Sequence, residues 1–135
     1  MHFGWNEPYP ANLAHLTSDG KHKGADYLVC IGTPVIASVD GIISEISETR
    51  DFGLHIIIKF TTGMLCKTYY HLILAHLSQI ITKKTVGNKI NKTEIIGLSG
   101  DSGSAKGHPH LHVQCNKLVK SVWVPVNPAF AIGES

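Results

Sequence analysis

Two histidines near the end of the chain have the type and spacing to do metal or proton chemistry. The run Gly107-His108-Pro109-His110-Leu111-His112-Val113 contains a His-x-His pair. In an extended segment successive side chains alternate between two faces, so His110 and His112 point together while Leu111 and Val113 point into a core. Imidazole is the commonest metal ligand and also titrates near neutral pH. One histidine of such a pair can therefore hold a metal ion while its neighbour handles protons.

A second cluster, His22-Lys23-Gly24-Ala25-Asp26-Tyr27, supplies a histidine and a carboxylate four residues apart. On a straight strand their α-carbons would lie about 13 Å apart, too far for one ion. The chain must therefore bend, and Gly24 permits a bend or a close backbone approach. His22, Asp26 and one histidine of the later pair would make three protein ligands, which leaves a tetrahedral zinc ion with an open position for water. The alternative is that Asp26 caps a turn and His22 is a surface residue.

A third candidate segment, Leu74-Ala75-His76-Leu77-Ser78, contains another histidine. The ordered motifs His-x-Gly-x-Asp-Tyr, Ala-His-Leu-Ser, Ile-Gly-Leu-Ser-Gly-Asp-Ser-Gly and His-Leu-His resemble the lysostaphin/LytM-type zinc endopeptidases, which cut bacterial cell-wall peptides. The resemblance runs from His22 to Val113. Two further stretches are similar to that family, namely Gly32-Thr33-Pro34-Val35 with Asp40-Gly41 and Val86-Gly87-Asn88-Lys89-Ile90.

The resemblance implies that His22, Asp26 and His112 are zinc ligands and that His110 and His76 are catalytic histidines outside the metal shell. Zinc at such a site lowers the pKa of its bound water toward neutrality and polarises the scissile carbonyl. One of the two histidines would orient or deprotonate the water, and the other would stabilise the oxyanion or protonate the leaving amine. The motifs do not assign these two roles.

Three positions depart from the family pattern. His108 adds an imidazole between the usual glycine and proline, Val113-Gln114 replaces Phe-Glu, and Leu74 stands where a tyrosine is common.

Tyr69-Tyr70-His71-Leu72 offers a rival alignment for the middle histidine, with a tyrosine two positions before His71. We prefer His76 because Ala75-His76-Leu77-Ser78 matches more letters of the motif. If the strand ends at Ala75, His76 lies at its terminus beside His110. His71 would then be a mid-strand residue that faces away from the site.

The fold class that we expect is all-β, as a compact antiparallel β-sandwich or barrel-like domain whose central sheet carries the zinc site among long loops around a groove. Short apolar runs rich in β-branched residues are separated by glycine, proline and aspartate. These runs are Tyr27–Ile31, Val35–Val39, Ile42–Ile46, Leu54–Phe60 and Met64–Leu74, followed near the end by the extended segment Val122–Pro128.

Thr61-Thr62-Gly63 and Asp40-Gly41 are expected to form tight turns, and Ser78–Lys84 the one short helical or irregular segment. We expect a single domain over residues 1–135, with a motif-bearing core at about 20–115.

Composition limits the classes of partner. The chain has 135 residues, 43% hydrophobic content and a net charge of only +2. These values favour one core and argue against an electrostatically driven nucleic-acid binder. Cys30, Cys66 and Cys115 lack Cys-x-x-Cys spacing and are expected to be small buried hydrophobes without disulfides. His2, His15 and His55 are expected to be ordinary polar packing residues.

The sequence suggests no signal peptide between Met1 and Leu16 and no run of transmembrane length. An enzyme of this kind would reach the cell wall by phage lysis, by injection with a virion or through a leader absent from this sequence. The expected partner is a peptidoglycan peptide, and we expect the protein to be a monomer.

Two other function classes remain open. One is a catalytically silent family member that acts as a regulatory or binding module. The other is a phosphocarrier of similar β architecture that passes a phosphoryl group between two histidines. Asp26 and the third histidine argue against phosphoryl transfer, which needs no three-ligand metal cage. Metal analysis of the purified protein separates these hypotheses from a zinc hydrolase.

Overall fold

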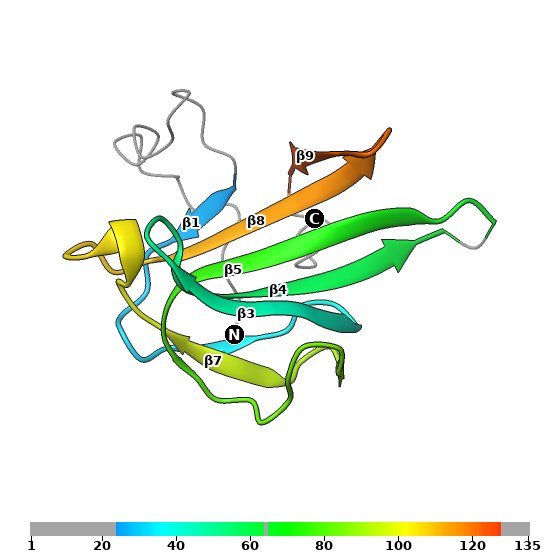
Figure 1. Ribbon diagram of the computed structural model, residues 1–135. Coiled ribbons are helices and arrows are strands. Elements are labelled where there is room, and N and C mark those ends of the chain that lie inside the picture. The colour runs from blue at the N-terminus through cyan, green and yellow to red at the C-terminus, as the bar shows by residue number, and fades with distance from the viewer. Residues whose placement is uncertain (1–23, 64, 128–135) are drawn as a thin grey trace.

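The computed structural model describes residues 24–63 and 65–127. These residues form nine strands in one hydrogen-bonded network, in which all the strand pairs are antiparallel (Figure 1). The strands are β1 (Ala25–Tyr27), β2 (Pro34–Ile36), β3 (Gly41–Thr49), β4 (Gly53–Thr62), β5 (Thr68–Ile80), β6 (Lys89–Ile90), β7 (Ile95–Ser99), β8 (Leu111–Val119) and β9 (Val122–Val126). The predicted antiparallel all-β class is confirmed.

The main layer has the order β1-β8-β5-β4-β3-β6, while β7 pairs with the end of β5 and carries β2. Figure 1 shows β7 below the layer of β3, β4, β5 and β8. Apolar side chains fill the interior from both sides, since Ile58 and Leu72 of the main layer and Ile96 of β7 are fully buried in one cluster. Burial of each such side chain contributes about 1.5–3 kcal/mol to folding.

The helical content of the described residues is small. One 3-10 turn, η2 (Gly103–Ala105), precedes β8, and no helix in this part of the chain is long and apolar enough to cross a membrane. The short helical or irregular segment expected at Ser78–Lys84 is only partly observed, because β5 continues to Ile80 and the chain becomes irregular after it. That extension is held by long-range pairing, in which Leu77 lies opposite Ser99 and Ile80 opposite Gly97.

Two other local predictions are corrected. β1 ends at Tyr27 instead of beginning there, and Leu28 and Ile31 are exposed. The Asp40-Gly41 segment is not a hairpin turn, because β2 pairs with β7 while β3 pairs with β4 and β6. Gly41 serves close packing, since a Cβ there would lie 2.5 Å from the Lys59 carbonyl oxygen. The hairpin expected at Thr61-Thr62-Gly63 is confirmed, but Thr61 and Thr62 belong to β4 and pair with Tyr69 and Thr68, so the connection begins only at Gly63.

The cysteines differ from expectation. Cys115 is buried on β8, but Cys30 and Cys66 are exposed. Cys30 lies in the loop after β1. Its backbone carbonyl accepts hydrogen bonds from the hydroxyls of Thr33 and Ser99. Cys66 lies in the connection between β4 and β5.

Candidate metal and catalytic site

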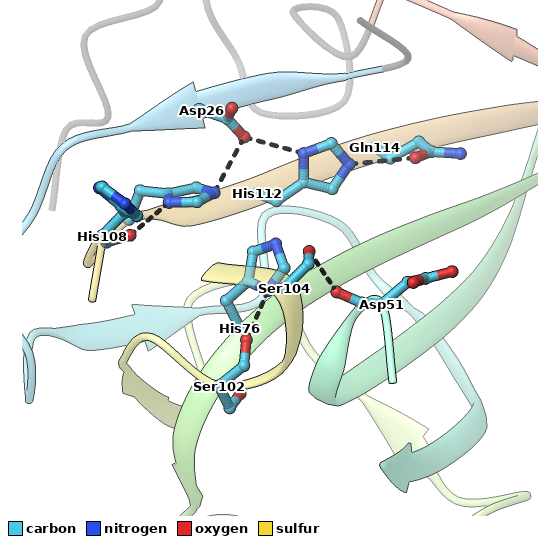
Figure 2. A network of polar contacts seen from close by, with 9 residues as sticks. Asp26, Asp51, His76, Ser102, Ser104, His108, His112 and Gln114 are labelled. Carbon is cyan, nitrogen blue, oxygen red and sulfur yellow. Dashed lines mark hydrogen bonds and ion pairs between the residues drawn. The ribbon is translucent and has the colours of Figure 1, made fainter. Parts of the chain in front are cut away.

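Strand register brings the Asp26 and His112 side chains together. β1 and β8 are antiparallel neighbours in which Asp26 lies directly opposite His112, although the two residues are 86 positions apart. Asp26 Oδ1 lies 2.8 Å from His112 Nδ1 and 3.6 Å from His110 Nε2 (Figure 2). Leu111 and Val113 are fully buried on the other face of β8, as the alternation of the His-x-His segment predicts. All three polar side chains are buried.

Gly24 allows this approach of β1 to β8. The chain bends at Gly24, and a Cβ there would lie 2.3 Å from the Val113 carbonyl oxygen. The expected close backbone approach is therefore confirmed. His22, the third predicted zinc ligand, lies outside the described residues.

His76 enters the site through a backbone irregularity. It has a φ of 62°. The β4–β5 register shifts once at this point, between the pairs Leu54–Leu77 and Ile56–Leu74, so that His55 alone faces Ala75 and His76. Such a bulge redirects a side chain and is common beside active sites. The His76 N–H donates to the Phe52 carbonyl at 2.8 Å. The ring centroid of His76 then lies 4.7 Å from that of His110 and 6.0 Å from that of His112.

Backbone carbonyls fix the tautomers of His76 and His110. His76 Nδ1 lies 2.8 Å from the Ser102 carbonyl, and His110 Nδ1 lies 2.7 Å from the His108 carbonyl (Figure 2). A carbonyl only accepts, so each Nδ1 carries the proton and each neutral ring keeps its lone pair on Nε2. Burial lowers the pKa of His76 to about 4, and the bond to Ser102 opposes that shift only in part. His108 itself is exposed and contributes its carbonyl oxygen.

Gln114 fixes the orientation of His112. Gln114 Oε1 lies 3.0 Å from His112 Nε2, while the Gln114 amide nitrogen donates to Asn116 Oδ1 at 3.2 Å. The Gln114 oxygen therefore accepts the Nε2–H of His112. With its proton on Nε2, a neutral His112 directs its Nδ1 lone pair at Asp26 Oδ1, an arrangement in which the nitrogen and the carboxylate oxygen can bind one metal ion.

The donors suit zinc. Imidazole nitrogen and carboxylate oxygen both bind zinc, at about 2.0–2.2 Å. Asp26 and His112 fit as two ligands of one ion, and the Gln114 contact is the outer-shell bond that a ligating histidine usually makes. Within residues 24–63 and 65–127 no group of three or more His, Cys, Asp or Glu side chains is arranged to hold a metal ion. A third protein ligand would have to come from outside these residues, where the predicted ligand His22 lies.

Ser102 connects the loop that precedes β8 to the bulge. Its hydroxyl donates to the Leu77 carbonyl at 2.7 Å and accepts the Leu54 N–H at 3.0 Å, while its carbonyl accepts from His76. Ser104 Oγ donates to the Asp51 carbonyl at 2.8 Å (Figure 2). Neither Ser102 nor Gln114 had a role predicted from the sequence. The alternation that groups His110 with His112 also places Gln114 and Asn116 on their face and could have identified Gln114.

His71 lies apart from the site. It pairs with Asn116, whereas Ala75 pairs with His112, so His71 shares the face of His112 but is four positions away along β5. The prediction that His71 faces away from the site is therefore wrong, because its side chain lies on the same face of the sheet as His112. His71 stacks on Trp123, with ring centroids 3.8 Å apart.

His55 is a buried polar residue, and its Nε2 atom lies 2.7 Å from Glu45 Oε2.

Comparisons with known proteins show which family this chain belongs to. The family model of peptidase family M23 matches residues 20–128. Peptidoglycan DD-endopeptidase ShyA of Vibrio cholerae is 38% identical over 93 residues, which are 69% of this chain and 20% of that protein. The chain thus spans about a fifth of the length of this curated relative.

Solved structures show the same fold. The catalytic domain of the antimicrobial peptidase lysostaphin from Staphylococcus simulans superposes with a TM-score of 0.71 and 27% identity, covering 94% of this chain and 87% of that one. A zinc-containing peptidase from Vibrio cholerae superposes with a TM-score of 0.62 and 26% identity, covering 83% of this chain and 30% of that one. The fold is therefore lysostaphin-like, and the chain belongs to peptidase family M23.

Proposed function

We propose that this protein is a zinc-dependent endopeptidase that hydrolyses peptide bonds in bacterial peptidoglycan, in a stem or a cross-bridge. The observation that carries the proposal is the buried contact between Asp26 Oδ1 and His112 Nδ1, which lie 2.8 Å apart beside two further histidines. Family membership supports the same chemistry.

Asp26 and His112, together with His22, would hold the ion in this proposal. Zinc bound there would acidify a water molecule and polarise a carbonyl group at neutral pH. Two features would position these ligands, because Asp26 lies opposite His112 in the β1–β8 register and the Gln114 oxygen accepts from the far side of the His112 ring.

His110 and His76 would move the protons. Each ring keeps Nδ1–H on a backbone carbonyl and leaves Nε2 available as an acceptor. Either Nε2 can take a proton from the attacking water and return it to the amine that leaves. The two rings lie close enough to act on one scissile bond, with centroids 4.7 Å apart.

The substrate follows from the relatives. ShyA is a peptidoglycan DD-endopeptidase, and we extend the cell-wall peptide substrate to this chain as part of the proposal. The protein would then act at the bacterial cell wall, delivered by a phage or secreted.

Hydrolysis of isolated cell walls tests this proposal. The purified protein should release new amino groups, and a zinc chelator should stop the release. His110→Ala should lose turnover while it keeps zinc, because its proposed work is proton transfer and not metal binding. Release of reducing sugar ends without new amines would identify a glycosidase and refute the proposal.

A further inference from the structure

The face of the sheet that carries His112 continues to a pocket. On β8, His112, Gln114, Asn116 and Leu118 share one face, opposite to that of the buried residues Val113 and Cys115. The register places His71 opposite Asn116 and Trp123 opposite Leu118 on that same face. In Figure 1, β9 lies near the end of the sheet that is remote from β1.

The pocket at this end is large enough for a small ligand. Its volume is about 560 Å³, within the range of about 300–1,000 Å³ that is usual for ligand pockets. The residues that line it lie in β3, β4, β5, β8 and β9 or directly before β3. They include Asp40, Ile42, Lys59, Tyr69, His71 and Trp123.

Aromatic rings provide much of the lining. The Trp123 and His71 rings are stacked face to face, with centroids 3.8 Å apart and an interplanar angle of 15°. Each ring covers one face of the other, and we call this two-ring stack the His71–Trp123 platform. Trp123 is 39% exposed and Tyr69 is 51% exposed, so both rings present surface to a ligand. An aromatic face carries partial negative charge and attracts the polarised C–H bonds of a ligand that lies flat on it.

The polar groups at the pocket are mixed in sign. Asp40 and Lys59 bring one carboxylate and one ammonium group, and Thr61 adds a hydroxyl that can donate and accept. Burial and the nearby Lys59 lower the pKa of His71, which keeps its ring neutral. With opposite charges that offset each other, the pocket does not select an ion. It suits an uncharged ligand with an apolar face and several hydroxyl or amide groups.

The spacing connects this pocket to the candidate zinc site. His112 and Asn116 are four positions apart on one strand, which corresponds to about 13 Å. An extended peptide of about four residues covers that distance. A substrate cut at His112 can therefore place in the pocket whatever is attached about four residues from the scissile bond.

We propose that the pocket formed around the His71–Trp123 platform binds an N-acetylated hexosamine of the glycan chain that carries the cleaved peptide. This inference rests on the proposed peptidoglycan substrate and adds a sugar subsite to it. A hexosamine has the required shape, with C–H bonds on one ring face and hydroxyl and acetamido groups around the rim.

Binding of a soluble tetramer of N-acetylglucosamine, which contains no peptide, tests the subsite without hydrolysis. Titration monitored by NMR should shift the indole N–H signal of Trp123. Trp123→Ala should weaken binding at least about tenfold, as expected for a lost stacking surface. Val124→Ala is the matched control because Val124 is similarly exposed on the same strand but points to the other face, and it should bind like the parent protein. His71→Ala should also weaken binding.

Kinetics on two substrates then separate the sugar subsite from the peptidase. Trp123→Ala should raise KM for a wall fragment that retains its sugar and leave KM for the same peptide without sugar unchanged. A parent protein that binds the tetramer but cleaves nothing would refute the peptidase and keep the subsite. Cleavage without any tetramer-induced shift at Trp123, or a shift caused by the sugar-free peptide alone, would overturn the subsite.

Discussion

Gln114→Leu should weaken zinc binding without changing any proposed ligand. The Gln114 oxygen accepts the Nε2–H of His112 and so keeps the Nδ1 lone pair directed at Asp26 Oδ1. Leucine is similar in size but accepts no hydrogen bond. Without the Gln114 oxygen, the His112 ring can rotate or become protonated on Nδ1. Either change must be reversed before zinc binds.

The magnitude follows from one buried hydrogen bond. The contact is 3.0 Å long and both side chains are buried. Leaving a buried donor unpaired costs about 1–3 kcal/mol, and loss of an outer-shell partner typically lowers metal affinity about 10–100-fold. We therefore expect the zinc Kd of Gln114→Leu to rise about 10–100-fold, measured by competition with a chromogenic chelator at neutral pH.

Two variants serve as controls. Gln114→Glu keeps an acceptor oxygen and should bind zinc within about tenfold of the parent protein. Asn116→Ala removes only the group that Gln114 donates to and should have a smaller effect than Gln114→Leu. A zinc Kd for Gln114→Leu equal to that of the parent protein would refute the role assigned to Gln114.

Three further predictions concern single residues. His76→Ala should lower turnover on a sugar-free peptide by about 100-fold or more with zinc retained, whereas His71→Ala should lower it less than about tenfold; the opposite ranking would favour the rival alignment. His76→Gly should be more stable to denaturant than His76→Ala by about 1 kcal/mol, because the φ of 62° strains any residue except glycine; equal midpoints would argue against that backbone strain. Burial raises the pKa of the Cys115 thiol to about 12, so a thiol reagent at mildly alkaline pH should modify Cys30 and Cys66 in the folded protein and reach Cys115 only on unfolding. Rapid labelling of Cys115 in the native state would contradict its placement in the core.

Local periodicity predicted the part of the site that lies on one strand. Alternation alone placed His110 and His112 on one face and Leu111 and Val113 in the core. The bend at Gly24 followed from the distance that a straight strand would impose. These predictions succeeded because they depend on geometry within a few residues.

Predictions that depend on long-range pairing were less accurate. The end of β5 was placed at Ala75, because nothing near His76 shows that β7 pairs with Leu77–Ile80. The bulge that directs His76 to the site requires two residues of β5 to oppose His55 of β4, which is a property of the pair of strands. The exposure of Cys30 was missed for the same reason, since its loop is held by Ser99 from β7.

The zinc content of the purified protein tests the central claim most directly. The account predicts about one zinc ion per chain in the parent protein by elemental analysis, and a large loss of zinc in Asp26→Ala and in His112→Ala, because each removes one of the three proposed ligands. His110→Ala should retain the metal. Stoichiometric zinc in both Asp26→Ala and His112→Ala, or a gently purified parent protein that neither contains nor binds zinc, would contradict the assignment of this site.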